Sequence, residues 1–175
     1  GVDASFELSY VKNSTLITFA PAPLFTAFEE VPITVSAKNQ FNPFGQDIVD
    51  ARIRLLGLGP RLQSNSSKTL RASSKLMGSL NNSEWQASVN WSQNRAAEAW
   101  RNLVSLENIS LGLGDSDLCA AVDGCVPINI FAPAATMDRG QLEYIAADAF
   151  NRGRSTLASL NLDISQVIDA GAWQQ

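Results

Sequence analysis

The stretch that decides the fold is TLRASSKLMGSLNNSEWQASVNWS, which runs from Thr69 to Ser92. In its first arm every second residue from Leu70 to Leu80 is apolar or small, and the residues between them are mostly polar. A cluster of turn formers, Asn81–Glu84, separates this arm from a second one in which Trp85, Ala87, Val89 and Trp91 alternate with polar residues. A period of two on both sides of a short polar turn predicts a β-hairpin. Soluble sandwiches also alternate, so the class depends on the rest of the chain.

The composition excludes several classes of function. The chain has 175 residues, of which 45% are hydrophobic and only 17% charged, with a formal net charge of −4. A nucleic-acid partner is therefore not predicted. Histidine is absent, which removes the commonest general base and metal ligand. Asp3 and Glu7 would lie on the same face of a β-strand, but nothing in the sequence makes them an acid/base pair. We therefore predict no enzyme, no cofactor and no metal.

Three further segments alternate in the same way. The predicted strands lie near residues 2–11, 69–80, 85–100 and 155–166, and residues 169–172 are predicted to form a turn. Two long irregular regions, 13–63 and 103–153, separate them. Inside these regions we expect a short strand at Ile33–Val35 and one short helix, 137–150, capped by Thr136. Loops of this length are unusual in a compact domain and are usually functional.

The order of strand, long loop, strand, short turn, strand, long loop, strand is typical of an antiparallel transmembrane β-barrel. The apolar parities would contact lipid, with Tyr10, Trp85 and Trp91 near the membrane interfaces, and the polar parities would line a wet lumen. Four strands cannot close a barrel, and unpaired strand edges are not tolerated in lipid. We therefore expect residues 1–175 to be a barrel segment of a larger protein, mature or excised, with no apolar run of the ~20 residues that a membrane helix needs.

The only two cysteines, Cys119 and Cys125, are spaced too widely for a Cys-x-x-Cys redox motif. Asp123 and Gly124 favour a tight turn between them. A disulfide that staples one loop is the preferred interpretation, and two unpaired buried thiols are the alternative.

Two loop motifs carry a resemblance to a known family. The first is Asn42-Pro43-Phe44-Gly45 with the downstream Leu58-Gly59-Pro60-Arg61, and the second is Cys125-Val126-Pro127-Ile128-Asn129-Ile130-Phe131, followed by Gln141-Leu142-Glu143-Tyr144-Ile145. In this order the chain resembles proteobacterial TonB-dependent outer-membrane receptors, a family with a barrel of about twenty-two strands and an internal plug.

The resemblance implies a middle section of such a receptor in the bacterial outer membrane, with regions 13–63 and 103–153 as extracellular loops and the plug domain absent. It implies energy-coupled uptake of a scarce nutrient such as an iron–siderophore complex. The implied partners are the remaining barrel strands and plug, the inner-membrane energising complex, outer-membrane lipid and a small-molecule ligand.

Five side chains are candidates for ligand binding: Phe41, Phe44, Arg71, Lys75 and Asn90. For the three polar residues the alternative is simple solvation of the lumen wall, and for the two aromatic residues it is anchoring of their own loop. Three carboxylates, Asp115, Asp117 and Asp123, lack the full calcium-loop pattern and are expected to be a solvated turn. The alternative class is a secreted soluble β-sandwich that binds a carbohydrate or protein, with Trp85, Val89 and Trp91 buried between its sheets.

Overall fold

The computed structural model describes residues 1–133 and 137–166, so the predicted cap at Thr136 and the predicted turn at 169–172 lie outside the described residues. The described chain is mostly antiparallel β-sheet with few helices, as the sequence predicts. None of the helices in this part of the chain is long and apolar enough to cross a membrane. The chain divides into two compact units.

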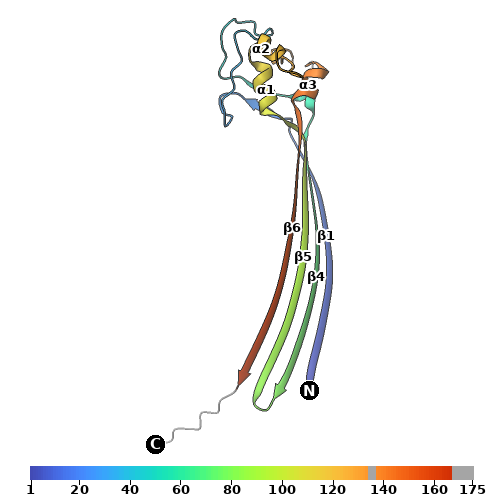
Figure 1. The fold of residues 1–175 in the computed structure, drawn as a ribbon. Helices are drawn as coiled ribbons and strands as arrows, with labels where there is room; N and C mark the ends of the chain where they lie inside the picture. The colour runs from blue at the N-terminus through green and yellow to red at the C-terminus, as the bar shows by residue number, and fades with distance from the viewer. Residues whose placement is uncertain (134–136, 167–175) are drawn as a thin grey trace, which may run out of the picture. The chain divides into compact units, whose positions relative to one another are not determined.

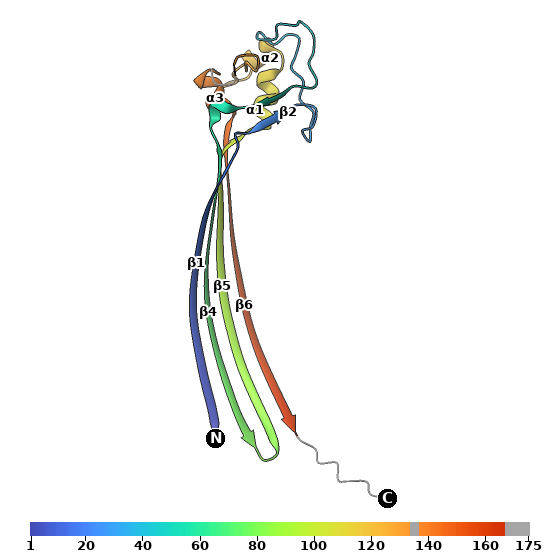
Figure 2. The same ribbon diagram turned by 180° about the vertical axis from the view of Figure 1, so that it is seen from behind.

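The first unit is a sheet of long neighbouring strands. It contains Gly1–Thr15, Asn65–Ala97 and the chain from Arg152. These segments belong to β1 (Val2–Phe19), β4 (Arg61–Leu80), β5 (Ser83–Val104) and β6 (Ala146–Gln166). The strands lie side by side in the order β1-β4-β5-β6, which is also their order along the chain (Figures 1 and 2). The sheet is therefore a simple up-and-down meander.

Each long strand extends beyond the bounds predicted from alternation. β1 continues to Phe19, β4 begins at Arg61, β5 continues to Val104, and β6 begins at Ala146. One added segment of β4, Ser64-Asn65-Ser66-Ser67-Lys68, is polar on both faces of the strand. Alternation reports only the part of a strand that has one apolar face, so it misses a segment in which both faces are polar.

The hairpin between β4 and β5 turns in two residues, Asn81 and Asn82, instead of the predicted four. Asn81 has a φ of 54°, a left-handed conformation that asparagine adopts more readily than most residues. Near this turn the indole of Trp85 lies over Gly78, where an added Cβ would be 2.7 Å from a ring carbon. A tight turn and this cross-strand contact both fix the pairing of the two strands.

The second unit comprises Leu16–Ser64 and Glu98–Asn151. Besides the ends of the long strands, it contains a small antiparallel pair, β2 (Pro23–Phe25) with β3 (Arg52–Arg54), and a 3₁₀ turn, η1 (Leu56–Leu58). Its helices are α1 (Leu106–Leu113), α2 (Ser116–Ala120) and α3 (Arg139–Ile145). The prediction of one helix is therefore wrong, because α1 and α2 lie in a region that we expected to be irregular.

The bounds of the predicted helix 137–150 are also wrong. α3 begins after Asp138, whose side chain accepts a hydrogen bond from the Gly140 backbone, and it ends at Ile145. Ala149, predicted on the apolar stripe, belongs to strand β6. Sheet pairing overrides the helical pattern there, because intrinsic helix propensity is a weak preference compared with tertiary context. Ile33–Val35 likewise forms no strand, only an isolated bridge from Val35 to Ile48.

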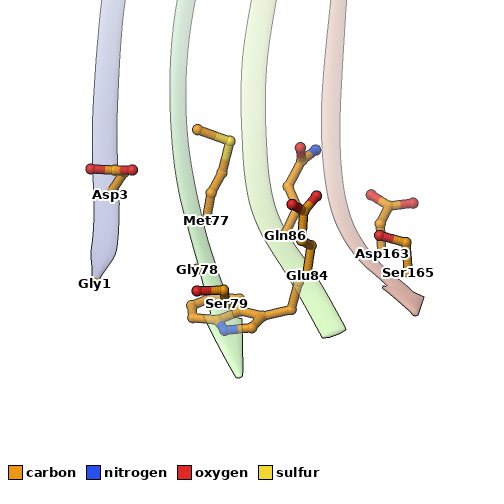
Figure 3. A pocket seen from close by; sticks show the side chains of 10 residues that line it. Gly1, Asp3, Met77, Gly78, Ser79, Glu84, Gln86, Asp163 and Ser165 are labelled. Atoms are coloured by element: carbon orange, nitrogen blue, oxygen red, sulfur yellow. The ribbon is translucent and has the colours of Figure 1, made fainter. Parts of the chain in front are cut away.

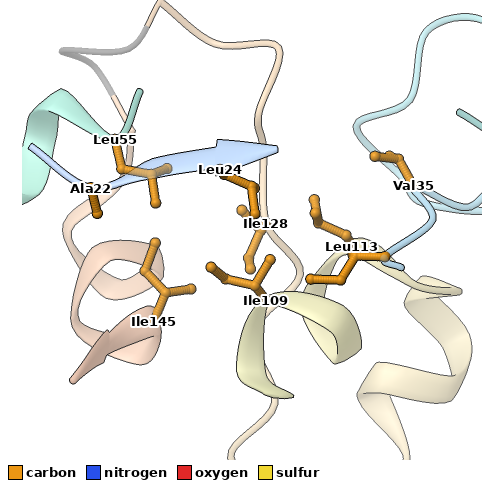
Figure 4. Close-up of a cluster of buried hydrophobic side chains, with 9 residues drawn as sticks. Ala22, Leu24, Val35, Leu55, Ile109, Leu113, Ile128 and Ile145 are labelled. Carbon is orange, nitrogen blue, oxygen red and sulfur yellow. The ribbon is translucent and has the colours of Figure 1, made fainter. Parts of the chain in front are cut away.

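A core of aliphatic side chains holds the second unit together (Figure 4). It joins side chains from segments that are far apart in the sequence: Ala22, Leu24, Ile33, Val35, Leu55, Ile109, Leu113, Ile128 and Ile145. Full burial of each large aliphatic side chain contributes about 1.5–3 kcal/mol. The segments between the long strands are therefore a packed structure of their own.

Candidate functional site

The two faces of the sheet in the first unit differ in chemistry. On β5 and β6 the polar face is defined by two side-chain contacts, from Asn90 to Ser159 at 3.5 Å and from Asn161 to Ser88 at 3.4 Å. Since side chains alternate along a strand, the neighbouring residues Val89 and Leu160 lie on the opposite face. The residues on this polar face are therefore the ones that the sequence predicts to line the lumen.

Three of the predicted site residues lie around two neighbouring hollows on the polar face. One hollow of about 450 Å³ is lined by Arg71, Asn90 and Ser159, among others. The other, of about 530 Å³, is lined by Glu7, Lys75 and Asn90, among others. Asn90 contributes to both hollows. Arg71, Lys75 and Asn90 therefore lie on one hydrogen-bonding surface, which also carries the Glu7 carboxylate and is suited to an oxygen-rich polar ligand.

A third hollow lies near the turn and is acidic (Figure 3). Asp3, Glu84 and Asp163 contribute to it from β1, β5 and β6. Among the described residues, no group of three or more carboxylates or cysteines is close enough to hold a metal ion. These carboxylates come from separate strands, and a charged group in contact with water needs no ion-pair partner.

In the second unit, residues 36–47 form a loop fastened by its own asparagine and aspartate side chains. The buried amide of Asn39 donates to the Gly112 carbonyl at 2.9 Å, and Asn42 donates to the carbonyls of Ser36 and Gln46, both at 2.9 Å. The Asp47 carboxylate accepts from the Ala37 backbone at 2.7 Å. Hydrogen bonds of this kind satisfy the turn without regular secondary structure, so the loop conformation is specified locally.

Phe41 and Phe44, the other two predicted site residues, are carried by this loop. In each case an asparagine two residues earlier accepts the phenylalanine backbone N–H at 3.0 Å, Asn39 for Phe41 and Asn42 for Phe44. Phe41 is half-buried, which fits the anchoring interpretation. Phe44 is 63% exposed, and anchoring therefore does not account for its position.

The exposed ring of Phe44 has an aromatic neighbour that is not among the predicted site residues. Phe131 lies edge-on to Phe44, with ring centroids 5.8 Å apart and an interplanar angle of 70°. Its backbone N–H is also held by an asparagine two residues earlier, Asn129, at 3.0 Å. The repeated Asn-x-Phe triplet was the signal in the sequence that identifies this third ring. Two exposed aromatic rings on fastened loops form a surface suited to an apolar or aromatic group.

The candidate calcium carboxylates do not converge. Asp115 caps α2 by accepting the Asp117 backbone N–H at 2.9 Å and pairs with Lys38 at 3.3 Å. The hydrogen bond from Asp117 and the Lys38 ammonium hold the pKa of Asp115 below its ordinary value of 3.8, although partial desolvation opposes them. Asp115 is therefore a cap and an ion-pair partner.

The predicted disulfide is confirmed. Cys119 and Cys125 are bonded, with their Cα atoms 5.4 Å apart. Cys119 is buried, and it lies in α2 next to the Asp115 cap. The disulfide closes the short loop that follows α2.

The two units therefore carry separate candidate sites. The first unit has a polar sheet face around Asn90, and the second unit has an exposed aromatic pair, Phe44 and Phe131. The searches against protein-family models, curated proteins and solved structures returned no match to this chain.

Proposed function

We propose that the chain is a membrane-inserted segment of a β-barrel receptor in the bacterial outer membrane, of the TonB-dependent type. The single observation that carries the proposal is the exposure of the apolar sheet face. Phe6 on β1 is 71% exposed, Val89 on β5 is 53% exposed, and Leu162 on β6 is 70% exposed. Exposed large apolar side chains occur on every strand of this face, from Val2 on β1 to Ile164 on β6.

The length of this face fits a bilayer. On one face of β1, apolar residues extend from Val2 to Tyr10, which is about 26 Å of strand at ~3.3 Å per residue. A strand tilt of about 40° reduces this to about 20 Å, close to the ~25 Å apolar band of outer-membrane barrels. Lipid is therefore a suitable medium for the face, whereas in water it would be an unusually large apolar patch.

The outer strands of the sheet require partners. β1 and β6 are each paired on one side only among the described residues. In lipid, unpaired backbone N–H and C=O groups cost several kcal/mol each, roughly, so further strands must pair with both edges. The partners we propose are the remaining barrel strands, with a plug through which the inner-membrane energising complex acts.

For the transported ligand we propose a scarce small-molecule nutrient, such as an iron–siderophore complex. The Phe44–Phe131 pair supplies an apolar surface on fastened loops, and Arg71, Lys75 and Asn90 supply polar contacts on the wall. A siderophore combines apolar or aromatic groups with oxygen-rich groups, so each surface by itself suits one part of such a ligand. Pre-organised loops also reduce the entropic cost of binding.

The alternative, a soluble β-sandwich binding module, requires Trp85, Val89 and Trp91 to be buried. The two tryptophans are half-buried and Val89 is 53% exposed. No specific observation favours this alternative, but the experiment below distinguishes the two proposals.

The experiment compares two arginine substitutions at adjacent positions on opposite faces. Val89→Arg places a charge on the apolar face near the middle of the band, and Ser88→Arg places the same charge on the polar face. In the full-length protein refolded into phosphatidylcholine vesicles, Val89→Arg should lower folding stability by about 2–4 kcal/mol, as measured by urea titration. Ser88→Arg should stay within about 1 kcal/mol of the parent.

Vesicle flotation provides the second measurement. The parent and Ser88→Arg proteins should float with the vesicles and resist extraction by high salt. Equal urea midpoints for the two variants would refute lipid contact at Val89. A parent protein that remains folded and monomeric in plain buffer and does not float would establish the soluble alternative.

A further inference from the structure

The apolar face changes character along its strands. On β4 the parity that carries Leu70, Leu76 and Leu80 continues away from the turn to Lys68 and Ser66. On β5 the parity of Trp91 and Val89 continues to Arg95. On β6 the parity of Leu160 and Leu162 continues to Arg154 and Arg152. Beyond the apolar band, the same face is therefore basic on three adjacent strands.

Strand pairing aligns these cations. The two-residue turn makes Leu80 and Ser83 partners, and the same count along the hairpin pairs Lys68 with Arg95. The side-chain contacts of Asn90 with Ser159 and of Ser88 with Asn161 define the pairing of β5 with β6. Counted from those contacts, Arg95 pairs with Arg154. Lys68, Arg95 and Arg154 thus form a row across the sheet, and we call these residues the cationic row.

A hollow of about 560 Å³ brings the row together. Its lining includes Lys68, Arg95 and Arg154, together with Arg152, the next residue of the same parity on β6. The remaining lining residues are serine, alanine and glycine, so no carboxylate contributes to the hollow. All of these residues belong to the first unit. Lys12, of the same parity on β1, adds another cation to this face.

The row is unfavourable for the sheet alone. Like charges directly opposite each other on neighbouring strands destabilise a sheet. Lys68, Arg95 and Arg154 form no ion pair with any described residue, and all three are exposed. Arg95 has only a neutral neighbour, donating to the Gln93 side chain at 3.0 Å. An external anion would therefore offset a repulsion that the described chain leaves uncompensated.

We propose that the cationic row binds the phosphate of an anionic lipid headgroup, where the apolar band meets the polar border of the membrane. This inference rests on the proposed membrane insertion of the apolar face. The cationic row lies next to the end of the apolar band at which Tyr10 and Trp91 are found. Aromatic residues of this kind are typical of a membrane interface. Guanidinium groups match phosphate oxygens in geometry and charge, and basic residues next to a membrane attract anionic lipid.

The test uses two double variants that each remove two positive charges. Lys68→Gln/Arg95→Gln alters the row, and Arg54→Gln/Arg139→Gln is the matched control, at two exposed arginines of the second unit. The full-length protein in detergent is titrated with phosphatidylglycerol, and bound lipid is counted by native mass spectrometry. The row variant should bind about 25-fold more weakly, at about fivefold per charge removed, and the control should match the parent.

A second measurement separates binding from a merely structural role. In detergent without anionic lipid, the row variant should melt at a higher temperature than the parent, because the cross-strand repulsion is relieved. Adding phosphatidylglycerol should then raise the melting temperature of the parent more than that of the row variant. Equal lipid binding by the row and control variants overturns the proposal.

Two further measurements show which of the two proposals a negative result contradicts. Inorganic phosphate alone should not displace the lipid, and full displacement at millimolar phosphate would make the row a free-phosphate site instead. Vesicle flotation of the parent tests membrane insertion separately. A parent that floats, with a row variant that binds lipid normally, overturns only the lipid site. A parent that does not float overturns both proposals.

Discussion

Replacing Gly112 in α1 with alanine should destabilise the second unit, although the same substitution stabilises most helices. An alanine in a helix interior is favoured over glycine by about 1 kcal/mol. At Gly112, however, an added Cβ would be 2.6 Å from two side-chain carbons of Ile128 and 2.7 Å from the Val126 carbonyl oxygen. The backbone carbonyl has no rotamer by which to move away.

Overpacking of a core costs about 1–3 kcal/mol. The rigid contact at Gly112 places the cost near the upper end, which leaves a net loss of about 2 kcal/mol after the helix propensity is subtracted. The Gly112 carbonyl also accepts hydrogen bonds from the Asn39 side chain and the Ile128 backbone, both at 2.9 Å. A displaced helix would weaken both bonds.

Hydrogen exchange of the Ile109 and Leu113 amides measures this change within the second unit, and urea titration measures it globally. Ser110→Ala, an exposed position in the same helix, is the matched control and should be neutral or stabilising by a few tenths of a kcal/mol, roughly. If the two amides are protected equally well in the Gly112→Ala and Ser110→Ala variants, the close approach of Gly112 to Ile128 and Val126 is refuted.

Three further predictions concern the turn and the loops. Asn81→Ala should cost about 1 kcal/mol in a urea titration because of its positive φ, while Asn81→Gly and Asn82→Ala should be nearly neutral. Cys125→Ser should lower the stability of the second unit by about 2 kcal/mol, and its melting temperature should no longer respond to dithiothreitol. The lowered pKa of Asp115 contributes stability above pH 3.8 that is lost as the pH falls through its folded pKa. An acid titration of Asp115→Asn should lack this component, and an unchanged acid transition would contradict the pairing with Lys38.

The sheet could be predicted from sequence because its signal is local. The alternation on either side of Asn81 requires only that one face be apolar, and that face is sufficient to define four strands and their polar parity. The start of β4 could not be predicted, since Ser64–Lys68 is polar on both faces and has no apolar period.

Most of the structure of the second unit could not be predicted from the sequence, because it depends on contacts between segments that are far apart in the chain. α1 is short, and its burial against Leu24, Leu55 and Ile128 is a property of the packed core. Of the candidate site, Arg71, Lys75 and Asn90 could be placed on one face by parity alone. The Asn-x-Phe triplets single out Phe44 and Phe131 in the sequence. The contact between the two rings joins loops that are far apart in the sequence, so no local pattern predicts that contact.

The two-residue turn between β4 and β5 makes the hairpin unusually sensitive to insertions. Because side chains alternate strictly, one extra residue at Asn81–Asn82 either forms a bulge or reverses the facing of all of β5. Reversal would move Trp85 and Val89 to the polar face and Asn90 to the apolar one. In segments 20–60 and 105–145, an extra residue in an exposed loop does not reverse the facing of a long strand. Length variation among homologous chains is therefore expected in those segments, while the turn should keep its length even where its residues differ.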